Sequence, residues 1–593
     1  MDHSNNQPDS NHTNHLSRLE RARQNRLLEQ LAEREAAEKA EQERQHTIHM
    51  EENAKEQPQV LFMDTPLPEK SLRADLYPLA EEPKPVPAAP AKSESVLSRP
   101  EISKPEPIHE PTFVADSSEQ PALEAPATAD TQPMKDVLAS INPYSLLLES
   151  QKQFFGRKAT IDRSFRRQQL KLLKGIILNR KQDILDALYQ DLGKSAEEAY
   201  MSEVGLTLSA INWQIRHLND NTSAKLHLAP IHEFPALSKT VNIPYGNVLI
   251  MAPWNYPFLL AMVPLAEAIA AGNTAIVKTG HAATNTSRVI REICEAVFER
   301  DYVAVIEGGH EEISALLELK FDYIFFTGGK KLGSIVYEAA AKHMTPVTLE
   351  LGGKSPAVID ESANLALAAK RIVFGKFLNA GQTCVAPDYV VVHESVKERF
   401  LILLEKEIKK QYPNPEDIGR IISEPRYEHL LSLVQPDKVI IGGYASGPTL
   451  QIEPTVMDNV SWDDPVMQEE IFGPILPVLT YTDFRSLMKK LADLPTPLAF
   501  YLFSRNKLHQ RFVEYVQPFG GGCINDTVIQ LTSDNLPFGG MGASGMGQYH
   551  GKWGFETFSH TKAIVKKAPW PDLPMRYNNR KPWMGKLIEL VLH

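Results

Sequence analysis

The sequence contains little cysteine: Cys294, Cys384 and Cys523 are the only three in 593 residues. So few thiols exclude a disulfide framework, and their odd number is typical of a protein from a reducing compartment. The first thirty residues are polar and charged and include no apolar run, so the sequence predicts no secretory signal. The most apolar stretch, residues 248–277, is interrupted by prolines, an asparagine and a glutamate, which predicts buried core and no membrane span.

The sequence also lacks an excess of positive charge. Its net charge is −11, and residues 1–137 carry all of it, with 15 Lys and Arg against 26 Asp and Glu. Neither this tail nor the balanced remainder offers a positive field to nucleic acid, so we expect no nucleic-acid partner. At 593 residues the chain is longer than a domain with a single hydrophobic core normally is, which predicts two or more domains.

Residues 1–137 have the composition of an appendage. Helix formers dominate residues 17–45, where Ser17 and Glu20 have the spacing of a capping box, but the leucines keep no sustained heptad. We therefore predict a charged helix, either solvated or bound to a partner that the sequence does not identify. Residues 58–133 hold 15 of the 43 prolines and too few apolar residues to form a core, so we predict a disordered linker.

Apolar runs of strand length alternate with helical segments from about Asn142 onward. The runs that end in Gly, Pro or polar residues include NVLIMAP, NTAIVKT, VAVIEG and FDYIFFTGG. This alternation predicts an α/β fold in which a parallel sheet is covered on both faces and ligands bind at the carboxyl ends of the strands. A second alternating block, at about residues 348–538, makes two α/β lobes the expected architecture.

Glycines follow one of these predicted strands at Gly328 and Gly329, and Gly333 lies in the helical segment after them. They would let the backbone approach a phosphate at the helix N-terminus, although a plain strand-to-helix turn explains the same residues. The next strand, VTLELGG, puts Glu350 on the face opposite Leu349, where the carboxylate either faces solvent or points into a cleft. In a cleft, desolvation would raise its pKa toward that of a useful base.

Cys384 lies in a polar loop between a helical segment and the strand DYVVVH. It is either an inert cysteine or a nucleophile, and a nucleophile there depends on a thiol pKa lowered from about 8.5. Cys294 falls among apolar residues at helical spacing and is predicted to be core. Cys523, beside a glycine run, is predicted to be structural.

Five motifs together carry a resemblance to a known family. In chain order they are APWNYP (252–257), VTLELGGKSP, GQTCVAPDYV, QEEIFGPILPV (468–478) and NLPFGGMGASGMGQYHGKWGFETFSH (535–560). Their order and separations resemble the aldehyde dehydrogenase superfamily, and the third and fifth resemble its class 3 group most. The resemblance covers about residues 140–565, and the tail before it has no counterpart. It implies NAD(P)-dependent oxidation of aldehydes, medium- or long-chain or aromatic, to carboxylic acids.

The resemblance also implies which residues do the chemistry. Cys384 would be the nucleophile that forms a thiohemiacetal and, once hydride has left, a thioester. The side chain of Asn255 would stabilise the oxyanion. Glu350 would be the general base that activates water to hydrolyse the thioester, which argues against transfer of the acyl group to coenzyme A. No metal is expected in this site.

The resemblance further implies where NAD or NADP would bind. Glu470 and Phe472 correspond to the residues that hold and flank the nicotinamide ribose, and Lys278 corresponds to the lysine at the adenosine ribose. Gly328 and Gly333 correspond to the helix start that approaches the pyrophosphate.

Two departures from the family pattern concern the cofactor. His281 stands where many relatives carry a glutamate that binds the adenosine ribose hydroxyls and repels a 2′-phosphate. Losing that carboxylate removes a bar to NADP, so we expect NADP to be used at a measurable rate. Gly329 stands where relatives often have a serine in the phosphate-contacting loop, which removes one hydroxyl contact.

The resemblance implies a Rossmann-type cofactor domain, an α/β catalytic domain and a bridging segment for oligomerisation. We expect the cofactor domain at 138–220 and 244–350, the catalytic domain at 351–543, and the bridge at 221–243 and 544–593. The class 3 resemblance also implies a homodimer. The sequence ends without the hydrophobic anchor that some class 3 relatives carry, so we expect a cytoplasmic enzyme.

Two other interpretations stay open at this point. One is a catalytically inactive dehydrogenase-fold scaffold whose tail binds partners, which the presence of Cys384, Glu350 and Asn255 argues against. The other is an esterase that uses the same cysteine and base without redox chemistry. Formation of NADH from an aldehyde would distinguish the enzyme from both.

Overall fold

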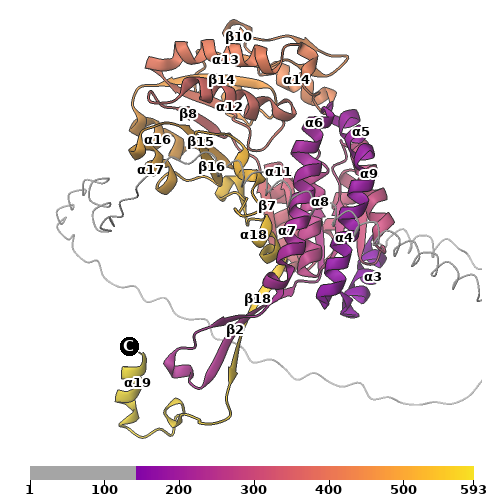
Figure 1. The fold of residues 1–593 in the computed structure, drawn as a ribbon, viewed down its shortest axis with the longest axis vertical. Helices are drawn as coiled ribbons and strands as arrows, with labels where there is room; N and C mark the ends of the chain where they lie inside the picture. Colours follow the sequence, from indigo (N-terminus) through magenta and orange to yellow (C-terminus); the bar gives the residue numbers. More distant parts are fainter. Residues whose placement is uncertain (1–141, 593) are drawn as a thin grey trace, which may run out of the picture. The chain divides into compact units, whose positions relative to one another are not determined.

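The computed structural model describes residues 142–592, so the predicted charged helix and disordered linker of the N-terminal tail lie outside the described residues. Two large α/β sheets and a three-stranded extension organise the described part (Figure 1). The α/β class predicted from the alternation of strands and helices is confirmed. The predicted domain boundaries stay a prediction.

The first sheet has six strands in the order β17-β7-β6-β3-β4-β5. Its neighbouring strands are parallel except β17, which pairs antiparallel with β7. The apolar runs that end in Gly, Pro or polar residues all form strands of this sheet, as expected. The bounds are β3 Asn247–Met251, β4 Thr274–Lys278, β5 Val303–Ile306, β6 Tyr323–Gly328, β7 Val347–Leu351 and β17 Gly545–Met546.

Alternate residues of these strands enter two hydrophobic clusters, one on each face of the sheet. Val248 and Ile250 of β3 belong to one cluster, and Leu249 and Met251 belong to the other. Helices therefore cover both faces, as a parallel sheet requires. The first face carries α4 Arg163–Asn179, α5 Lys181–Leu192, α7 Gly205–Thr222, α8 Leu259–Ala271 and α9 Thr284–Val297; the second carries α3 Ser145–Gly156, α10 His310–Leu317 and α11 Lys330–His343.

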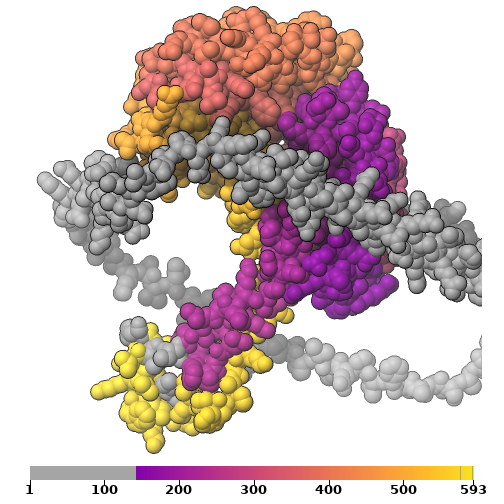
Figure 2. All heavy atoms as spheres, viewed as in Figure 1, coloured from indigo at the N-terminus to yellow at the C-terminus, as the bar shows by residue number. Residues whose placement is uncertain are grey.

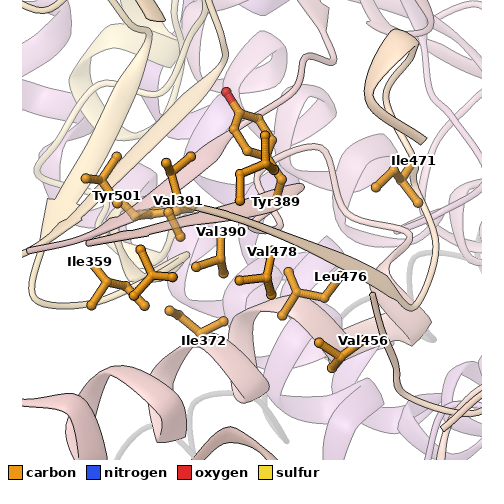
Figure 3. Close-up of a cluster of buried hydrophobic side chains, with 14 of the residues drawn as sticks. Ile359, Ile372, Tyr389, Val390, Val391, Val456, Ile471, Leu476, Val478 and Tyr501 are labelled. Carbon is orange, nitrogen blue, oxygen red and sulfur yellow. The ribbon is translucent and has the colours of Figure 1, made fainter. Parts of the chain in front are cut away.

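The second sheet has seven strands in the order β10-β13-β14-β9-β8-β15-β16. In β9, Tyr389 and Val391 point to one side, and Val390 points to the other side, toward Ile372 of α12 (Figure 3). Its strands are β8 Pro356–Ile359, β9 Tyr389–His393, β10 Val439–Ile441, β13 Thr455–Met457, β14 Ile475–Tyr481, β15 Ala499–Phe503 and β16 Gly521–Ile524. The main helices around it are α12 Leu365–Phe377, α13 Lys397–Gln411, α14 Glu424–Ser432, α16 Phe484–Asp493 and α17 Lys507–Tyr515.

The third sheet joins β1 Lys225–His227, β2 Ala236–Pro244 and β18 Ser559–Lys567. Most of β1 and β18 is exposed, and the magenta and yellow residues of these strands project from the surface in Figure 2. Upstream of β18, β17 pairs with β7, and α18 Gly551–Thr557 packs against α7 and α8. The segment 544–593 therefore contributes to the first sheet before it enters the extension and ends in α19 Met584–Leu592.

The three cysteines differ in their surroundings. Cys294 of α9 is buried, which confirms the prediction that it belongs to the core. Cys523 of β16 is half-buried, and its thiol lies 3.0 Å from the side-chain oxygen of Gln530. Across residues 142–592, none of the helices is long and apolar enough to cross a membrane.

Candidate active site

A cavity of about 240 Å³ lies where the carboxyl ends of β6 and β7 meet loops of the second sheet. Thr327 of β6, Glu350 of β7 and the loop residue Cys384 all line it. Most of the remaining wall is apolar, which favours a ligand with an extended apolar part. The apolar lining includes Met201, Leu206, Leu260, Phe374, Leu498 and Phe538.

An unusual turn delivers Cys384 to this cavity. After α12, the chain forms a short 3-10 turn, Leu378–Gly381, in which Asn379, Ala380 and Gly381 have φ values of 54°, 52° and 72°. Such left-handed values in non-glycine residues are strained and persist only where the surroundings hold them. At Gly381 a Cβ would lie 2.2 Å from the carbonyl oxygen of Gly473, so only glycine allows this close approach.

The Cys384 thiol is half-buried, and its loop folds into the cavity wall. Burial raises its pKa to about 12, and the nearby carboxylates of Glu470 and Glu350 add to the rise. The lowered thiol pKa on which the nucleophile alternative depends is therefore not observed. The polar loop, which appears exposed in the sequence, is covered by apolar residues from distant parts of the chain.

Asn255 lies in the loop between β3 and α8 and is 3% exposed. Its side-chain N–H donates to the carbonyl oxygen of Gln382 at 3.0 Å, two residues before the cysteine. Its neighbour Tyr256 is within hydrogen-bond distance, 2.6 Å, of the Thr383 hydroxyl. Two contacts therefore tie the Asn255 loop directly to the loop that carries Cys384.

Glu350 occupies the buried face of β7 that points into the cavity, 2% exposed, so the cleft alternative is the one observed. Neither of its carboxylate oxygens has a hydrogen-bond partner among the described residues. Burial raises its pKa well above the ordinary value. In its ionised form this carboxylate is a stronger base than an exposed glutamate.

Glu470 follows the short helix α15 Pro465–Gln468 and packs against the chain just after β7. A Cβ on Gly352 would lie 2.1 Å from its Oε2 atom, so the absence of a side chain at Gly352 makes room for the carboxylate. Burial and the nearby Asp388 raise the pKa of Glu470 to about 8. Phe472 has a positive φ of 49°, and its ring meets Trp254 edge-on at 5.5 Å.

Lys278 ends β4, and its ammonium group donates to the carbonyl oxygens of Thr279 at 2.6 Å and Gly308 at 2.7 Å. Burial lowers its pKa to about 8. His281 lies three residues further on, exposed, with its ring 6.0 Å from that of His310. Both predicted cofactor residues lie at the carboxyl edge of the first sheet, and neither lines the cavity.

The turn after β6 leads into α11, whose N-cap residue is the exposed Gly329. The first N–H groups of this helix have no acceptor within the helix, as at any helix N-terminus, so they can donate to an anion. Added Cβ atoms would meet Phe326 at Gly328 and Leu351 at Gly333, both under 3 Å. Packing of α11 against β7 is therefore sufficient to explain Gly333, and the Phe326 ring of its own strand, β6, is sufficient to explain Gly328. Gly329 is the glycine with open space beside it.

These residues fit a dinucleotide cofactor. Oε1 of Glu470 is buried without a partner among the described residues, as expected for an acceptor of ribose hydroxyl groups. Lys278 and the N-terminus of α11 offer donors along the same edge of the sheet. NAD or NADP requires an acceptor for one ribose and donors for the pyrophosphate and the other ribose. Glu470 would be that acceptor, and the N-terminus of α11 and Lys278 would be those donors.

Sequence reasoning missed the residues that hold Asn255 in place. They are Lys194 and Glu203, which form a fully buried ion pair, and Asn379, which donates to the Asn255 carbonyl oxygen. The apolar cavity wall was missed as well, because its residues come from helices and loops far apart in the sequence. The available signal was a charged residue, Lys194, two positions after the buried end of α5 at Leu192.

Comparisons with known proteins identify the family of this chain. The family model described as Aldehyde dehydrogenase family matches residues 141–564. The 4,4'-diaponeurosporen-aldehyde dehydrogenase of Staphylococcus aureus is 48% identical, over 70% of this chain and 92% of that protein. Aldehyde dehydrogenase family 3 member A2 of mouse is 41% identical, over 68% of this chain and 84% of that protein. A solved structure, the substrate-bound state of Staphylococcus aureus AldH, has a TM-score of 0.74 at 44% identity, covering 76% of this chain and 100% of that one.

Proposed function

Because the chain belongs to the aldehyde dehydrogenase family, we propose that Cys384, Glu350 and Asn255 catalyse the oxidation of an apolar aldehyde to its carboxylic acid. The protein is an oxidoreductase that acts on aldehydes with NAD or NADP, which argues against the inactive-scaffold interpretation. The observation that supports the residue assignment is that Cys384 and Glu350 line one cavity whose remaining wall is mostly apolar.

In the first step, the Cys384 sulfur attacks the aldehyde carbon and forms a thiohemiacetal. Because burial raises the pKa of this thiol, its proton has to leave as the carbon–sulfur bond forms. We assign Glu350 as the acceptor, since it lines the same cavity and both its oxygens are free of other described partners. The proton then passes to solvent, and Glu350 is ready for the second step.

Asn255 stabilises the oxygen that becomes negatively charged. One of its two side-chain N–H groups is used by the Gln382 carbonyl, which leaves the second for the oxyanion. The backbone N–H of Cys384 is the second donor that we assign. NAD or NADP, held by Glu470 and Lys278, would supply the hydride acceptor for this carbon, and the oxidised carbon would stay on Cys384 as a thioester.

Glu350 acts again in the second step. It takes a proton from the water that attacks the thioester carbon, and the carbon–sulfur bond breaks to release the carboxylic acid. Glu470 would hold the nicotinamide ribose, with Phe472 beside it, and Lys278 would contact the adenosine ribose. The pyrophosphate would lie at the N-terminus of α11.

Apolar aldehydes are the substrate class that the cavity wall favours. Aliphatic and aromatic side chains form most of this wall, and its polar residues include Thr327, Glu350 and Thr383. Each buried methylene group of a substrate contributes about 0.8 kcal/mol of binding. Medium- or long-chain or aromatic aldehydes are therefore preferred over short ones.

His281 supports the use of NADP as well as NAD, because an exposed imidazole replaces the carboxylate that would repel a 2′-phosphate. For assembly, we propose a homodimer that uses the exposed extension of β1, β2 and β18. The predicted bridge at 221–243 and 544–593 contains these strands. We further propose a cytoplasmic location, for which the small number of cysteines is the supporting observation.

Steady-state assays of the purified protein test this function. NADH and NADPH formation are followed with aldehydes of increasing chain length and with benzaldehyde, beside the Cys384→Ser variant. We expect kcat/KM to rise with the chain length of the aldehyde. The Cys384→Ser variant should have a kcat/KM at least about 10³-fold below that of the parent. No NADH or NADPH from any aldehyde would overturn the function, and full activity of Cys384→Ser would overturn the residue assignment. Ester hydrolysis alone would favour the esterase interpretation.

A further inference from the structure

We propose that Lys194 and Glu203 are positioning residues that orient the Asn255 amide toward the reacting oxygen. The inference rests on the proposed function, in which Asn255 stabilises the oxyanion. Lys194 follows the C-terminal end of α5, and Glu203 lies in the π-helical turn Tyr200–Val204 between α6 Ala196–Ala199 and α7. Neither residue lines the cavity, and both form hydrogen bonds with the backbone of the segment that begins at Asn255.

The two side chains form an ion pair without access to solvent. The Lys194 ammonium lies 2.5 Å from Oε1 of Glu203, and both side chains are 0% exposed. Taking two charges out of water costs several kcal/mol each, and well-packed apolar residues often replace such a pair without loss of stability. The free energy of unfolding alone therefore does not explain why this pair lies here.

Both charged groups form further hydrogen bonds with the backbone of one short segment, residues 255–259. Lys194 donates to the carbonyl oxygen of Asn255 at 3.1 Å, and its ammonium lies 4.0 Å from the centre of the Tyr256 ring. Oε2 of Glu203 accepts from the backbone N–H groups of Phe258 at 2.9 Å and Leu259 at 3.2 Å. The pair therefore fixes both ends of the segment from Asn255 to the beginning of α8.

A second contact joins this segment to the cysteine loop. Asn379 donates from its side chain to the same Asn255 carbonyl oxygen at 2.8 Å. Its own backbone N–H donates at 2.8 Å to the carboxylate of Glu198, which lies in α6, two residues before the π-helical turn begins. The carbonyl oxygen of Asn255 thus accepts one hydrogen bond from Lys194 and one from Asn379. The two bonds together fix the orientation of this peptide plane.

That orientation determines where the catalytic amide points. The Asn255 side chain is short, so a rotation of its peptide moves the N–H groups by a comparable distance. A misplacement of about 1 Å at a reacting centre lowers a rate by about 10²-fold, and loss of one oxyanion donor lowers kcat by about 10²–10³-fold. A loosened ion pair should therefore lower kcat within this range while leaving the cofactor contacts unchanged.

The test compares Lys194→Met, Glu203→Gln and the double variant Lys194→Met/Glu203→Gln. Single variants leave one buried charge unpaired and can lose folded protein, whereas the double variant leaves none. For each folded variant, kcat, the KM for aldehyde and the KM for NAD are measured, with thermal unfolding as a check. We expect the double variant to lose about 100-fold in kcat, with the KM for NAD within about twofold of the parent.

Each substitution is repeated in the Asn255→Ala background, where the amide is absent. If the pair acts through Asn255, the double variant should add less than about twofold there, because the effects are not additive. Lys397→Met, which breaks an ion pair of 2.8 Å with Asp458 beside the second sheet, is the matched control and should keep kcat. Unchanged kcat in the folded double variant, or an equal loss in the Asn255→Ala background, would overturn the proposal. A parent protein without aldehyde oxidation would instead overturn the proposed function.

Discussion

Gly352→Ala should weaken cofactor use while leaving the fold intact. The added Cβ would lie 2.1 Å from Oε2 and 2.6 Å from Cδ of Glu470. A carbon–oxygen contact normally requires about 3.3 Å, so the carboxylate has to move by about 1.2 Å. It is the free end of a flexible side chain, and the φ of Gly352 is not in the left-handed region, so the glutamate moves and the backbone does not.

The size of the effect follows from the hydrogen bonds that the displaced carboxylate loses. Above its pKa of about 8 the Glu470 carboxylate is ionised, and hydrogen bonds to a charged group contribute about 1.5–3 kcal/mol, or about 10- to 100-fold in affinity. We therefore expect kcat/KM for NAD to fall by about 10- to 100-fold. Initial rates of NADH formation at varied NAD and saturating aldehyde measure it, and thermal unfolding should shift little.

Two further variants make this reasoning refutable. Gly156→Ala at the end of α3 is the matched control, because a Cβ there meets nothing within 4 Å, and it should keep kcat/KM within about twofold. In a Glu470→Ala background the clash disappears, so Gly352→Ala should have no further effect. If Gly352→Ala keeps full affinity for NAD, or lowers it equally without the Glu470 carboxylate, then Glu470 does not hold the cofactor.

Three further predictions concern the catalytic cysteine, the base and the cofactor choice. Because burial raises the pKa of Cys384 to about 12, its alkylation by iodoacetamide should quicken about tenfold per pH unit from pH 7 to 9, measured by mass spectrometry; a plateau near neutral pH would contradict it. Glu350→Gln should lower kcat by about 10²–10⁴-fold without lowering the unfolding temperature, and activity within tenfold of the parent would exclude Glu350 as the base. His281→Glu should lower kcat/KM for NADP by about tenfold or more relative to NAD, and a parent without NADP turnover would refute the assignment to His281.

The strands of the first sheet were predictable because each carries its own local signal. NVLIMAP and FDYIFFTGG combine strand length, an apolar composition and a terminating Gly or Pro, and both are strands in the structure. The two faces of β7 were also predictable, since a period of two separates Glu350 from Leu349. Local periodicity was sufficient for these elements.

The environment of Cys384 was not predictable in the same way. Its polar neighbours in the sequence favoured exposure, whereas apolar residues such as Met201 and Phe538 share the cavity wall with it, and burial raises its pKa. These residues are more than 150 positions away in either direction, so no local pattern reports them. The pKa of a group depends on what tertiary packing removes from water, and a sequence window does not contain that information.

The pair of Lys194 and Glu203 escaped prediction for a geometric reason. Their separation of nine residues does not put them on one face of a continuous helix, and the chain between them includes a π-helical turn. Such a turn has no reliable sequence signal. The partner of each charge was therefore visible only once the backbone path was known.

The π-helical turn at Tyr200–Val204 limits how the chain can change its length. A π-turn holds one more residue than an α-turn, so deleting a single residue there would restore an ordinary helix. The residues before the deletion would then rotate by about 100° around the helix axis relative to those after it. Glu198 would leave Asn379, and Met201 with Ser202 would leave the cavity wall, although every side chain named in the catalytic mechanism would still be present. Homologous chains that differ by one residue in this segment should therefore differ in activity toward the same aldehyde, even where their catalytic residues are identical.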